Sequence, residues 1–180
     1  MLFTKEEYKN RLKKVQTLMQ KKGIELLISQ DTNNMNYLTG YDAWSFYYPQ
    51  CVIVHANAEE PLCFVRAQDA GWAYIKTYLK RENVIVYDEK YIHTWPMHQY
   101  DLLIELIKKN KWDKLNIGVE MDSHYFTAYC YEKLKQGLPN AKIKDSERLV
   151  NWIRLIKSNN EIELMKGAAL ISKEAMKVAM

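Results

Sequence analysis

The chain has 180 residues, 48% of them apolar and 27% charged, which is enough for one sizeable domain with a real core and excludes an intrinsically disordered chain. Its net charge of +4 comes from 26 basic and 22 acidic residues spread along the sequence, and its apolar runs have the length of strands, so we expect no nucleic acid and no membrane as a partner. Acidic residues stand near the N-terminus where a signal peptide would be apolar, and the three cysteines form no C-x-x-C pair, so a cytoplasmic protein is expected.

The first predicted element is a helix that begins with a capping box, Thr4 with Glu7 three residues later. Apolar residues then recur at spacings of four and three up to Gly23, a typical helix end: Tyr8, Leu12, Val15 and Met19. The short apolar run at residues 24–28 predicts a buried strand. The polar, asparagine-rich residues from Ser29 onward predict a turn.

Residues 36–49 form the most unusual stretch, because six aromatic side chains surround one glycine: Tyr37, Tyr41, Trp44, Phe46, Tyr47 and Tyr48. Gly40 permits a turn that other residues resist, and Pro49 favours an extended residue before it. We expect a rigid aromatic platform that leads into a strand and serves as a small-ligand wall or a subunit interface. A loop that folds back to fill its own core is nearly as consistent with the sequence.

Two apolar runs separated by a polar turn predict a hairpin in the middle of a sheet. Residues 51–54 are apolar at every position, which indicates a strand covered on both faces, and residues 62–65 form its partner. A helix is predicted to begin at residues 66–69, with Asp69 placed favourably at its N-terminus. That helix is expected to run through Trp72, Ile75 and Leu79.

A predicted strand at residues 84–87 leads to a second aromatic loop, residues 91–98, which carries His93 and His98. Pro96 is expected at the first position of the following helix, because that position needs no N–H donor. The apolar residues of that helix are Leu102, Leu103, Leu106 and Ile107.

Three more elements complete this part of the chain: a strand at residues 115–119, a helix at 123–135 closed by Gly137 and Pro139, and a short strand at 141–144. Because strands alternate with helices, the predicted fold class is α/β, with a mixed central sheet of about five to six strands flanked by helices.

The chain is predicted to be helical from Ser146, with a break at residues 157–160 and a second capping box formed by Ser158 and Glu161. The apolar residues of the last helix form a stripe that needs a partner surface: Leu164, Ala168, Ile171, Ala175 and Val178. No glycine, asparagine or proline stops this helix before residue 180, so we expect the natural polypeptide to continue.

No catalytic motif is found. The four histidines (His55, His93, His98 and His124) lack the H-E-x-x-H and H-x-x-E-H spacings, and neither G-x-S-x-G nor a phosphate-binding glycine loop is present. His93 and His98 stand five residues apart across a proline, which favours loop or capping roles over a metal pair. Cys51 and His55 lie four residues apart in a predicted strand, too far to share a proton.

Nearly the whole chain resembles the N-terminal domain of the creatinase, prolidase and aminopeptidase P family, because six sequence segments occur in the order found in that family. They are Arg11-Leu12, Gly23-Ile24-Glu25-Leu26-Leu27, Asn36-Tyr37-Leu38-Thr39-Gly40-Tyr41, Arg66-x-Gln68-Asp69, Gly118-Val119-Glu120 and Arg154-x-Ile156-Lys157-Ser158-x-x-Glu161-Ile162. Residues 40–47, 66–70, 96–98 and 119–122 look most like the ectoine hydrolase branch and its dimethylsulfoniopropionate lyase relatives. Ala43 departs from the glycine expected there in that branch.

The resemblance implies a two-domain enzyme with a ribonuclease H-like N-terminal domain at residues 1–145, while residues 146–180 form the linker and first helix of a "pita-bread" catalytic domain. Two divalent ions (manganese, cobalt, zinc or iron) would lie in that second domain, and neither a catalytic nor a metal-binding residue carries over to this chain. The N-terminal domain would gate a small-molecule substrate and lean over the neighbour's active site in a homodimer. The alternative is a non-catalytic module of the same fold that binds peptides or proteins.

Within that picture, the substrate-gating candidates are Tyr41, Trp44, Tyr47, His93 and His98. Trp44 would offer a flat ring to a cationic or planar substrate, and the tyrosines would add hydroxyl hydrogen bonds. The structural candidates are Gly40, Arg66 and Asp69, with Arg66 expected to pair with Asp69.

Overall fold

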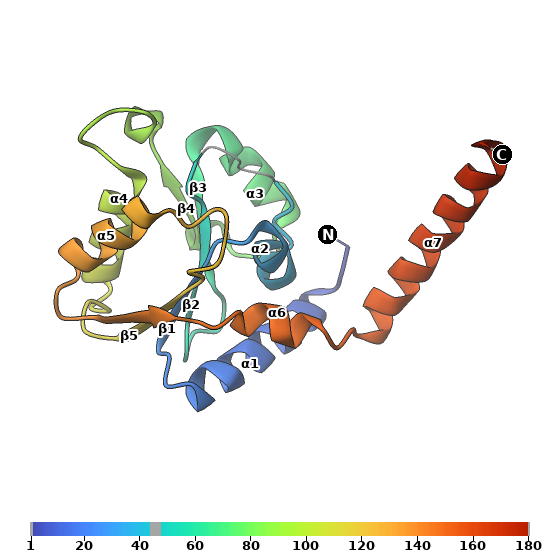
Figure 1. Cartoon of the computed structure of the whole chain (residues 1–180), viewed down its shortest axis with the longest axis horizontal. Helices are drawn as coiled ribbons and strands as arrows, with labels where there is room; N and C mark the ends of the chain where they lie inside the picture. Colours follow the sequence, from blue (N-terminus) through green and yellow to red (C-terminus); the bar gives the residue numbers. More distant parts are fainter. Residues whose placement is uncertain (1, 44–47, 180) are drawn as a thin grey trace.

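The computed structural model describes residues 2–43 and 48–179, and its strands form one six-stranded sheet in the order β4-β3-β2-β1-β5-β6 (Figure 1). The strands are β1 (Leu26–Ser29), β2 (Cys51–His55), β3 (Leu62–Arg66), β4 (Val84–Tyr87), β5 (Asn116–Val119) and β6 (Lys142–Asp145). β2 runs antiparallel to β1 and β3, and the other neighbours are parallel. The predicted α/β class, the mixed sheet and the central β2–β3 hairpin are confirmed.

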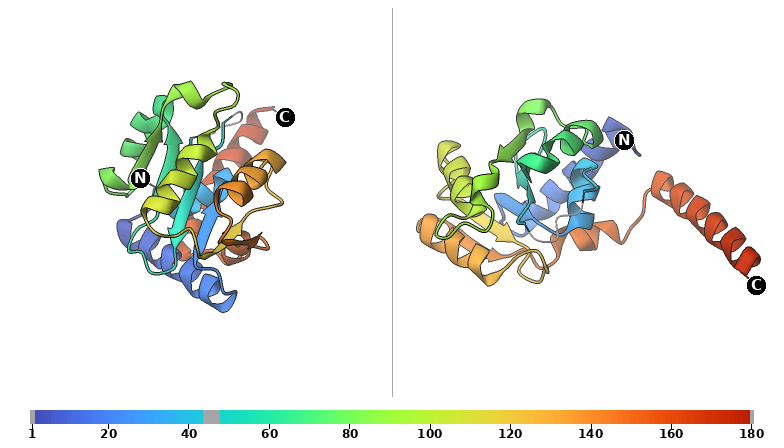
Figure 2. Two further views of the ribbon diagram at one scale, coloured as in Figure 1. Left: turned by 90° about the vertical axis from the view of Figure 1, so that its left-hand side faces the viewer. Right: turned by 90° about the horizontal axis from the view of Figure 1, so that it is seen from above.

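Helices cover both faces of this sheet (Figures 1 and 2). One face packs against α1 (Lys5–Lys21), α2 (Thr32–Thr39), α3 (Ala70–Lys76) and α6 (Leu149–Arg154), and the other against α4 (Gln99–Lys109) and α5 (Ala128–Gly137). In β2, Val52 and Val54 join the first core, and Cys51 and Ile53 join the second. This alternation confirms that β2 is covered on both faces, which explains its continuous apolar run.

The ends of α1 are those that the sequence predicts. The hydroxyl of Thr4 accepts a hydrogen bond from the backbone N–H of Glu7 at 3.2 Å, and the chain turns at Gly23 with a φ of +61°. The predicted apolar stripe is buried, including Val15 and Met19. Helix α1 therefore follows from local capping and periodicity alone.

The asparagine-rich segment is a helix, α2, and the turn predicted there is wrong. The side chain of Asp31 accepts hydrogen bonds from the backbone N–H groups of Asn33 and Asn34, so it caps the first turn. Asparagine disfavours helix interiors because its side chain competes for backbone groups, but here the side chain of Asn34 is bonded elsewhere in the fold.

The helix predicted through residues 66–79 is also different. It begins as a 3₁₀ turn, η1 (Ala67–Asp69), and α3 ends at Lys76, before Leu79. Trp72 and Ile75 are 45% and 71% exposed, whereas Ala70 and Ala73 face the core. The small residues allow α3 to lie close to the sheet, so the large apolar residues do not mark its buried face.

Three predicted helix starts are too early. Pro96 lies outside α4, which begins at Gln99 after an N-cap at His98. Helix α5 begins at Ala128, after the side chain of Thr127 caps it, and the residues from Ser123 to that cap form turns. Helix α6 begins at Leu149, three residues after the predicted start. The last helix, α7 (Asn159–Ala179), has the predicted capping box at Ser158 and Glu161.

Strands β1, β3, β4, β5 and β6 end at one edge of the sheet, and the antiparallel β2 begins there. The segments that follow or precede these strand ends therefore meet at this edge, which we call the carboxyl edge. Two further 3₁₀ turns occur, η2 (Arg81–Asn83) and η3 (Glu89–Tyr91), and η3 lies at the carboxyl edge. None of the helices in residues 2–43 and 48–179 combines the length and apolar composition that crossing a membrane requires.

Candidate functional site

The carboxyl edge gathers the segments that carry the predicted site residues. Ligands of open α/β sheets bind outside the carboxyl ends of the strands, because loops from several strands converge there. The segments at this edge precede β2 or follow β1, β3, β4, β5 and β6. Cavities at this edge include an aromatic pocket and a polar pocket.

The aromatic pocket has a volume of about 350 Å³ and combines three segments. Its lining residues are Tyr48, Pro49, Tyr91, His93, Thr94, Trp95, Met97, His98, Gln99, Thr127 and Tyr129. The rings of Trp95 and Tyr129 lie 6.0 Å apart, and Trp95 is 80% exposed. His93 and His98, both predicted as gating residues, therefore line one aromatic concavity.

His98 is held by the first turn of α4. Its imidazole Nδ1 accepts a hydrogen bond from the backbone N–H of Tyr100 at 3.1 Å. The backbone N–H of His98 donates to the side-chain carboxylate of Asp101 at 2.9 Å. Burial lowers the pKa of His98, nearby Lys133 lowers it further, and Asp101 opposes the shift. A neutral imidazole can keep Nδ1 as an acceptor, so the predicted capping role is confirmed for His98.

His93 occupies a left-handed backbone conformation, with a φ of +53°. Its ring meets the ring of Tyr48 edge to face, with centroids 5.6 Å apart. This contact joins the loop after β4 to the segment before β2. Trp44 and Tyr47, the other gating candidates of that segment, lie outside the described residues.

Tyr41 lies in the core, 1% exposed, and its hydroxyl donates a hydrogen bond to Oε1 of Gln50 at 2.6 Å. The amide of Gln50 in turn donates to Asp69 at 2.7 Å, and burial raises the pKa of Tyr41. In this structure the hydroxyl, which we expected to face substrate, bonds within the fold. Through Gln50, Asp69 therefore contacts the chain entering β2.

Gly40 has the structural role that its position suggests. Its φ is +84°, and its N–H donates to the carbonyl of Asn36 at the end of α2. A Cβ atom at this position would lie 2.8 Å from the hydroxyl of Tyr8 and 3.0 Å from the carbonyl of Lys76. Both the backbone angle and the space therefore require glycine.

Arg66 pairs with Glu89 and not with Asp69, which corrects the predicted ion pair. The two side chains form a pair with Nη2 and Oε2 2.7 Å apart, and the hydrogen bond from Arg66 lowers the pKa of Glu89. Arg66 ends β3, whose parallel neighbour β4 delivers Glu89 to its side. The guanidinium also stacks 4.2 Å from the ring centroid of Tyr48, so Arg66 supports a wall of the aromatic pocket.

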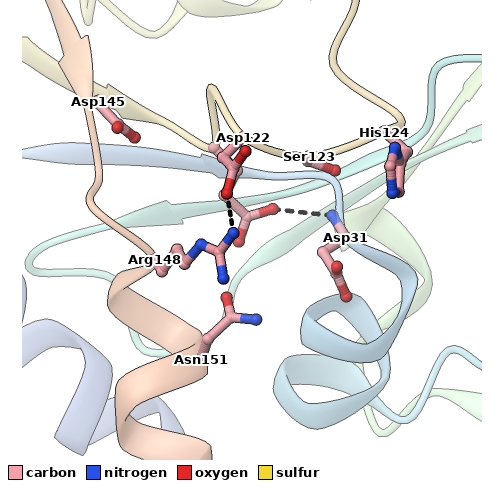
Figure 3. Close-up of a pocket in the computed structure, with 8 residues that line it drawn as sticks. Asp31, Asp122, Ser123, His124, Asp145, Arg148 and Asn151 are labelled. Carbon is pink, nitrogen blue, oxygen red and sulfur yellow. Dashed lines mark hydrogen bonds and ion pairs between the residues drawn. The ribbon is translucent and has the colours of Figure 1, made fainter.

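The polar pocket lies at the ends of β1, β5 and β6 and is shown in Figure 3. Its lining residues are Asp31, Glu120, Asp122, Ser123, His124, Asp145, Arg148 and Asn151. Arg148 and Asp122 point toward one another and form an exposed ion pair (Figure 3). The pocket therefore has charges of both signs on its rim.

Glu120 forms the buried base of this pocket. Its carboxylate accepts hydrogen bonds from the hydroxyl of Ser29 at 2.7 Å, from the backbone N–H groups of Gln30 and Asp31 at 2.6 and 2.8 Å, and from the amide of Asn34 at 2.7 Å. Burial raises the pKa of Glu120, and these donors oppose the rise. Four donors satisfy the carboxylate, so its main contribution is to hold the segment after β1 against β5.

The Glu120 network continues into α6 through Asn34. The amide of Asn34 also donates to Asn151 at 2.8 Å, and its carbonyl accepts from Arg154 at 2.7 Å. In the sequence, Glu120 belongs to a segment shared with the family, and no role was expected for it. An acidic residue directly after an apolar strand was the available signal, but its four partners are distant in sequence.

Metal binding does not fit the residues of this edge. In residues 2–43 and 48–179, no three His, Cys, Asp or Glu side chains form a group that could hold a metal ion. Glu120 is saturated by donors and Asp122 is paired with Arg148. The three cysteines are buried and unpaired, and burial raises the pKa of Cys63 to about 12, so it is not a reactive thiolate at neutral pH.

Comparison with known proteins gives a family match over most of the chain. The model of the creatinase/prolidase N-terminal domain matches residues 11–156. Ectoine hydrolase from Halomonas elongata is 42% identical over 170 residues, which cover 94% of this chain and 42% of that protein. The chain thus spans less than half the length of this relative.

Solved structures have the same fold at low sequence identity. The Xaa-Pro dipeptidase from Bacillus anthracis superposes with a TM-score of 0.73 at 16% identity, covering 94% of this chain and 42% of the dipeptidase. The creatinase/prolidase N-terminal domain of an X-Pro dipeptidase from Streptococcus pyogenes gives a TM-score of 0.61 at 18% identity and covers 79% of this chain and 98% of that domain. These similarities concern the fold.

Proposed function

Because the chain belongs to the creatinase/prolidase N-terminal domain family, we propose that it is the substrate-gating and dimerisation domain of a metal-dependent hydrolase. The enzyme would cleave a C–N bond in a small amide or amidine-like molecule or in an Xaa-Pro dipeptide, and its relatives include proteins named ectoine hydrolase, creatinase and Xaa-Pro dipeptidase. The domain itself would not catalyse.

The aromatic pocket is the observation that carries this proposal. It lies at the edge where α/β folds bind ligands, and it combines aromatic rings from three segments with two histidines of the loop after β4. Aromatic surfaces discriminate small planar or cationic molecules by shape and by contact with the ring face. A wall of this kind selects a substrate without taking part in bond cleavage.

The proposal assigns metal chemistry to a different part of the polypeptide. Residues 1–145 would form the N-terminal domain, and residues 146–180 the linker and first helix of a catalytic domain that holds two divalent ions of manganese, cobalt, zinc or iron. The described part of α7 has no buried residue and carries exposed Leu164, Ile171 and Val178, which supports a domain partner along this helix. A metal pair would supply an activated water there.

Dimerisation and location are parts of the same proposal. The exposed Trp95 sits on the rim of the aromatic pocket, where a second copy could bury it while bringing the pocket over its active site. The three unpaired cysteines favour a reducing compartment, so we place the protein in the cytoplasm.

Hydrolysis assays on two proteins test this proposal. The purified chain, supplied in parallel with each of the four metals, should not hydrolyse ectoine, creatine or an Xaa-Pro dipeptide. A polypeptide that joins this domain to its metal-bearing half should hydrolyse one of these substrates. Turnover by the chain of residues 1–180 alone would contradict the proposal.

A non-catalytic binding module is the second candidate. An open aromatic pocket with a highly exposed tryptophan would also suit a peptide or protein partner. The two candidates differ in the sequence that follows this domain. Intact metal ligands there favour the hydrolase, and their loss favours the binding module.

A further inference from the structure

Helix α7 extends away from the body of the protein (Figures 1 and 2). None of its residues in the described range, 159–179, is buried, so no packed core fixes its direction. Its first turn is closed by the capping box, in which Oε2 of Glu161 accepts from the N–H of Ser158 at 2.8 Å. The other carboxylate oxygen of Glu161 remains free to contact the body.

That second oxygen faces Arg11, a residue of α1 that is only 2% exposed. Nη2 of Arg11 lies 3.4 Å from Oε1 of Glu161, and Nε donates to Glu7 at 3.1 Å. Nη1 donates to the carbonyl of Tyr37 at 3.4 Å. Nη2 is inaccessible to solvent and has no hydrogen-bond partner among the described residues, and the carboxylate of Glu161 is a counter-charge 3.4 Å from it.

Aromatic rings hold the guanidinium in this orientation. Its central carbon lies 4.0 Å from the ring centroid of Phe3 and 4.6 Å from that of Tyr37. A planar fork fixed between rings can face two carboxylates at once, whereas a lysine ammonium presents one point charge. Because the guanidinium of Arg11 is buried, the loss of a carboxylate partner would leave part of its positive charge uncompensated, which is energetically unfavourable.

The other charged residues that line the cavity beside this pair have partners of their own: Arg154 donates to Asn34, and Asp42 contacts Lys76 and Trp72. Arg11, Glu161, Tyr37 and Phe3 all line a cavity of about 500 Å³ between the body and the start of α7, so this junction is hollow. Glu161 is also less exposed than Glu163, which lies two residues further along α7, with 19% side-chain exposure against 71%. Because few side chains pack at this junction, an ion pair across it can determine the angle between α7 and the body of the protein.

We propose that Arg11 and Glu161 are positioning residues that fix the direction in which α7 leaves the body. The functional consequence rests on the proposed function: if α7 leads into the catalytic half, this pair sets how the aromatic pocket is seated relative to the active site. Oε2 of Glu161 caps the helix at Ser158, and Oε1 faces Arg11. The ion pair with Arg11, and not the helix cap, therefore fixes the direction of α7.

Distance measurements between spin labels in the chain of residues 1–180 test the proposal. Cysteines introduced at the exposed positions Lys14 on α1 and Lys173 on α7 carry the labels, and the three native cysteines are buried. The variant Glu161→Gln keeps an oxygen that can cap Ser158 but removes the charge that faces Arg11. The distance distribution, narrow in the parent, should broaden at least twofold in this variant.

Glu163→Gln is the matched control, since Glu163 is exposed and pairs only with Lys166 among the described side chains. It should leave the distribution unchanged. Arg11→Lys, which retains the charge but not the fork, should broaden the distribution as Glu161→Gln does. If Glu161→Gln gives the parental distribution while its circular dichroism shows an intact helix, the positioning role is wrong. Because the measurement involves no substrate, it is independent of whether the domain gates a hydrolase.

Discussion

The carboxylate of Glu120 accepts a hydrogen bond from the side-chain amide of Asn34 at 2.7 Å, which ties the end of β5 to the first turn of α2. Through the same amide, Asn34 reaches Asn151 on α6. One buried acid thus connects the end of β5 with α2 and, through Asn34, with the helix that precedes α7.

Replacing Glu120 with glutamine should destabilise the fold by about 2–4 kcal/mol, because a neutral amide turns an N–H₂ group toward backbone donors and leaves them unsatisfied. Urea unfolding followed by circular dichroism measures the change. Glu105→Gln, the same substitution at an exposed position of α4, is the control and should cost less than about 0.5 kcal/mol. Equal stabilities for the two variants would mean that the four hydrogen bonds contribute little.

Substituting alanine for each of three glycines should distinguish the cost of a strained backbone angle from the cost of a steric clash with the added Cβ. At Gly23, where φ is +61° and no atom lies within 4 Å of the added Cβ, the cost should be about 1 kcal/mol. At Gly40 the Cβ also meets Tyr8 and Lys76, so the cost should be about 2–4 kcal/mol. Gly71→Ala, inside α3 with open space, should be neutral or stabilising. Thermal unfolding gives the ranking, and a Gly40 variant no worse than the Gly23 variant would refute the steric argument.

Stability should fall below about pH 6.5 in part because of His98. Its pKa is lowered in the folded protein, so the unfolded chain binds more protons as the pH falls through the ordinary value of 6.5. The contribution of His98 to the free energy of unfolding is therefore complete above that pH and is lost below it. Protonation of Nδ1 removes the acceptor for the N–H of Tyr100.

Unfolding free energies of the parent and His98→Asn, measured from pH 5 to 8, test this effect. Asparagine can still cap α4, so the variant should lose less stability than the parent as the pH falls. His124→Asn, the same substitution at an exposed histidine outside the α4 cap, is the variant for comparison. Parallel profiles for the parent and His98→Asn would show that the cap does not titrate.

Much of the fold could be predicted, because its determinants are local. The strands are short apolar runs, and Thr4, Ser158 and Gly23 mark helix ends by their own chemistry. Helix α2 was missed because the partners that occupy the Asn34 side chain lie 86 and 117 residues away. The end of α3 was misplaced because Ala70 and Ala73, not the larger residues, face the sheet.

The candidate site was predicted less completely, because the pairing of distant strands determines which side chains come together there. The sequence places His93 and His98 in one loop, but only the fold brings them beside Tyr48 and Tyr129. Arg66 was assigned to Asp69, three residues away, whereas the parallel pairing of β3 and β4 presents Glu89. Tyr41 belongs to a buried chain of hydrogen bonds that a count of aromatic residues cannot distinguish from a ligand wall.

The most direct test of the gating role is a substrate-discrimination ratio. In the proposed polypeptide that joins this domain to a metal-bearing half, kcat/KM should be measured for ectoine and for an Xaa-Pro dipeptide, together with bound metal. Trp95→Ala removes an 80% exposed ring, so the fold should persist, and Trp112→Ala at the opposite edge of the sheet is the control. We predict that Trp95→Ala changes the ratio of the two kcat/KM values by about tenfold or more at unchanged metal content, whereas Trp112→Ala does not. An unchanged ratio in the Trp95 variant would contradict it.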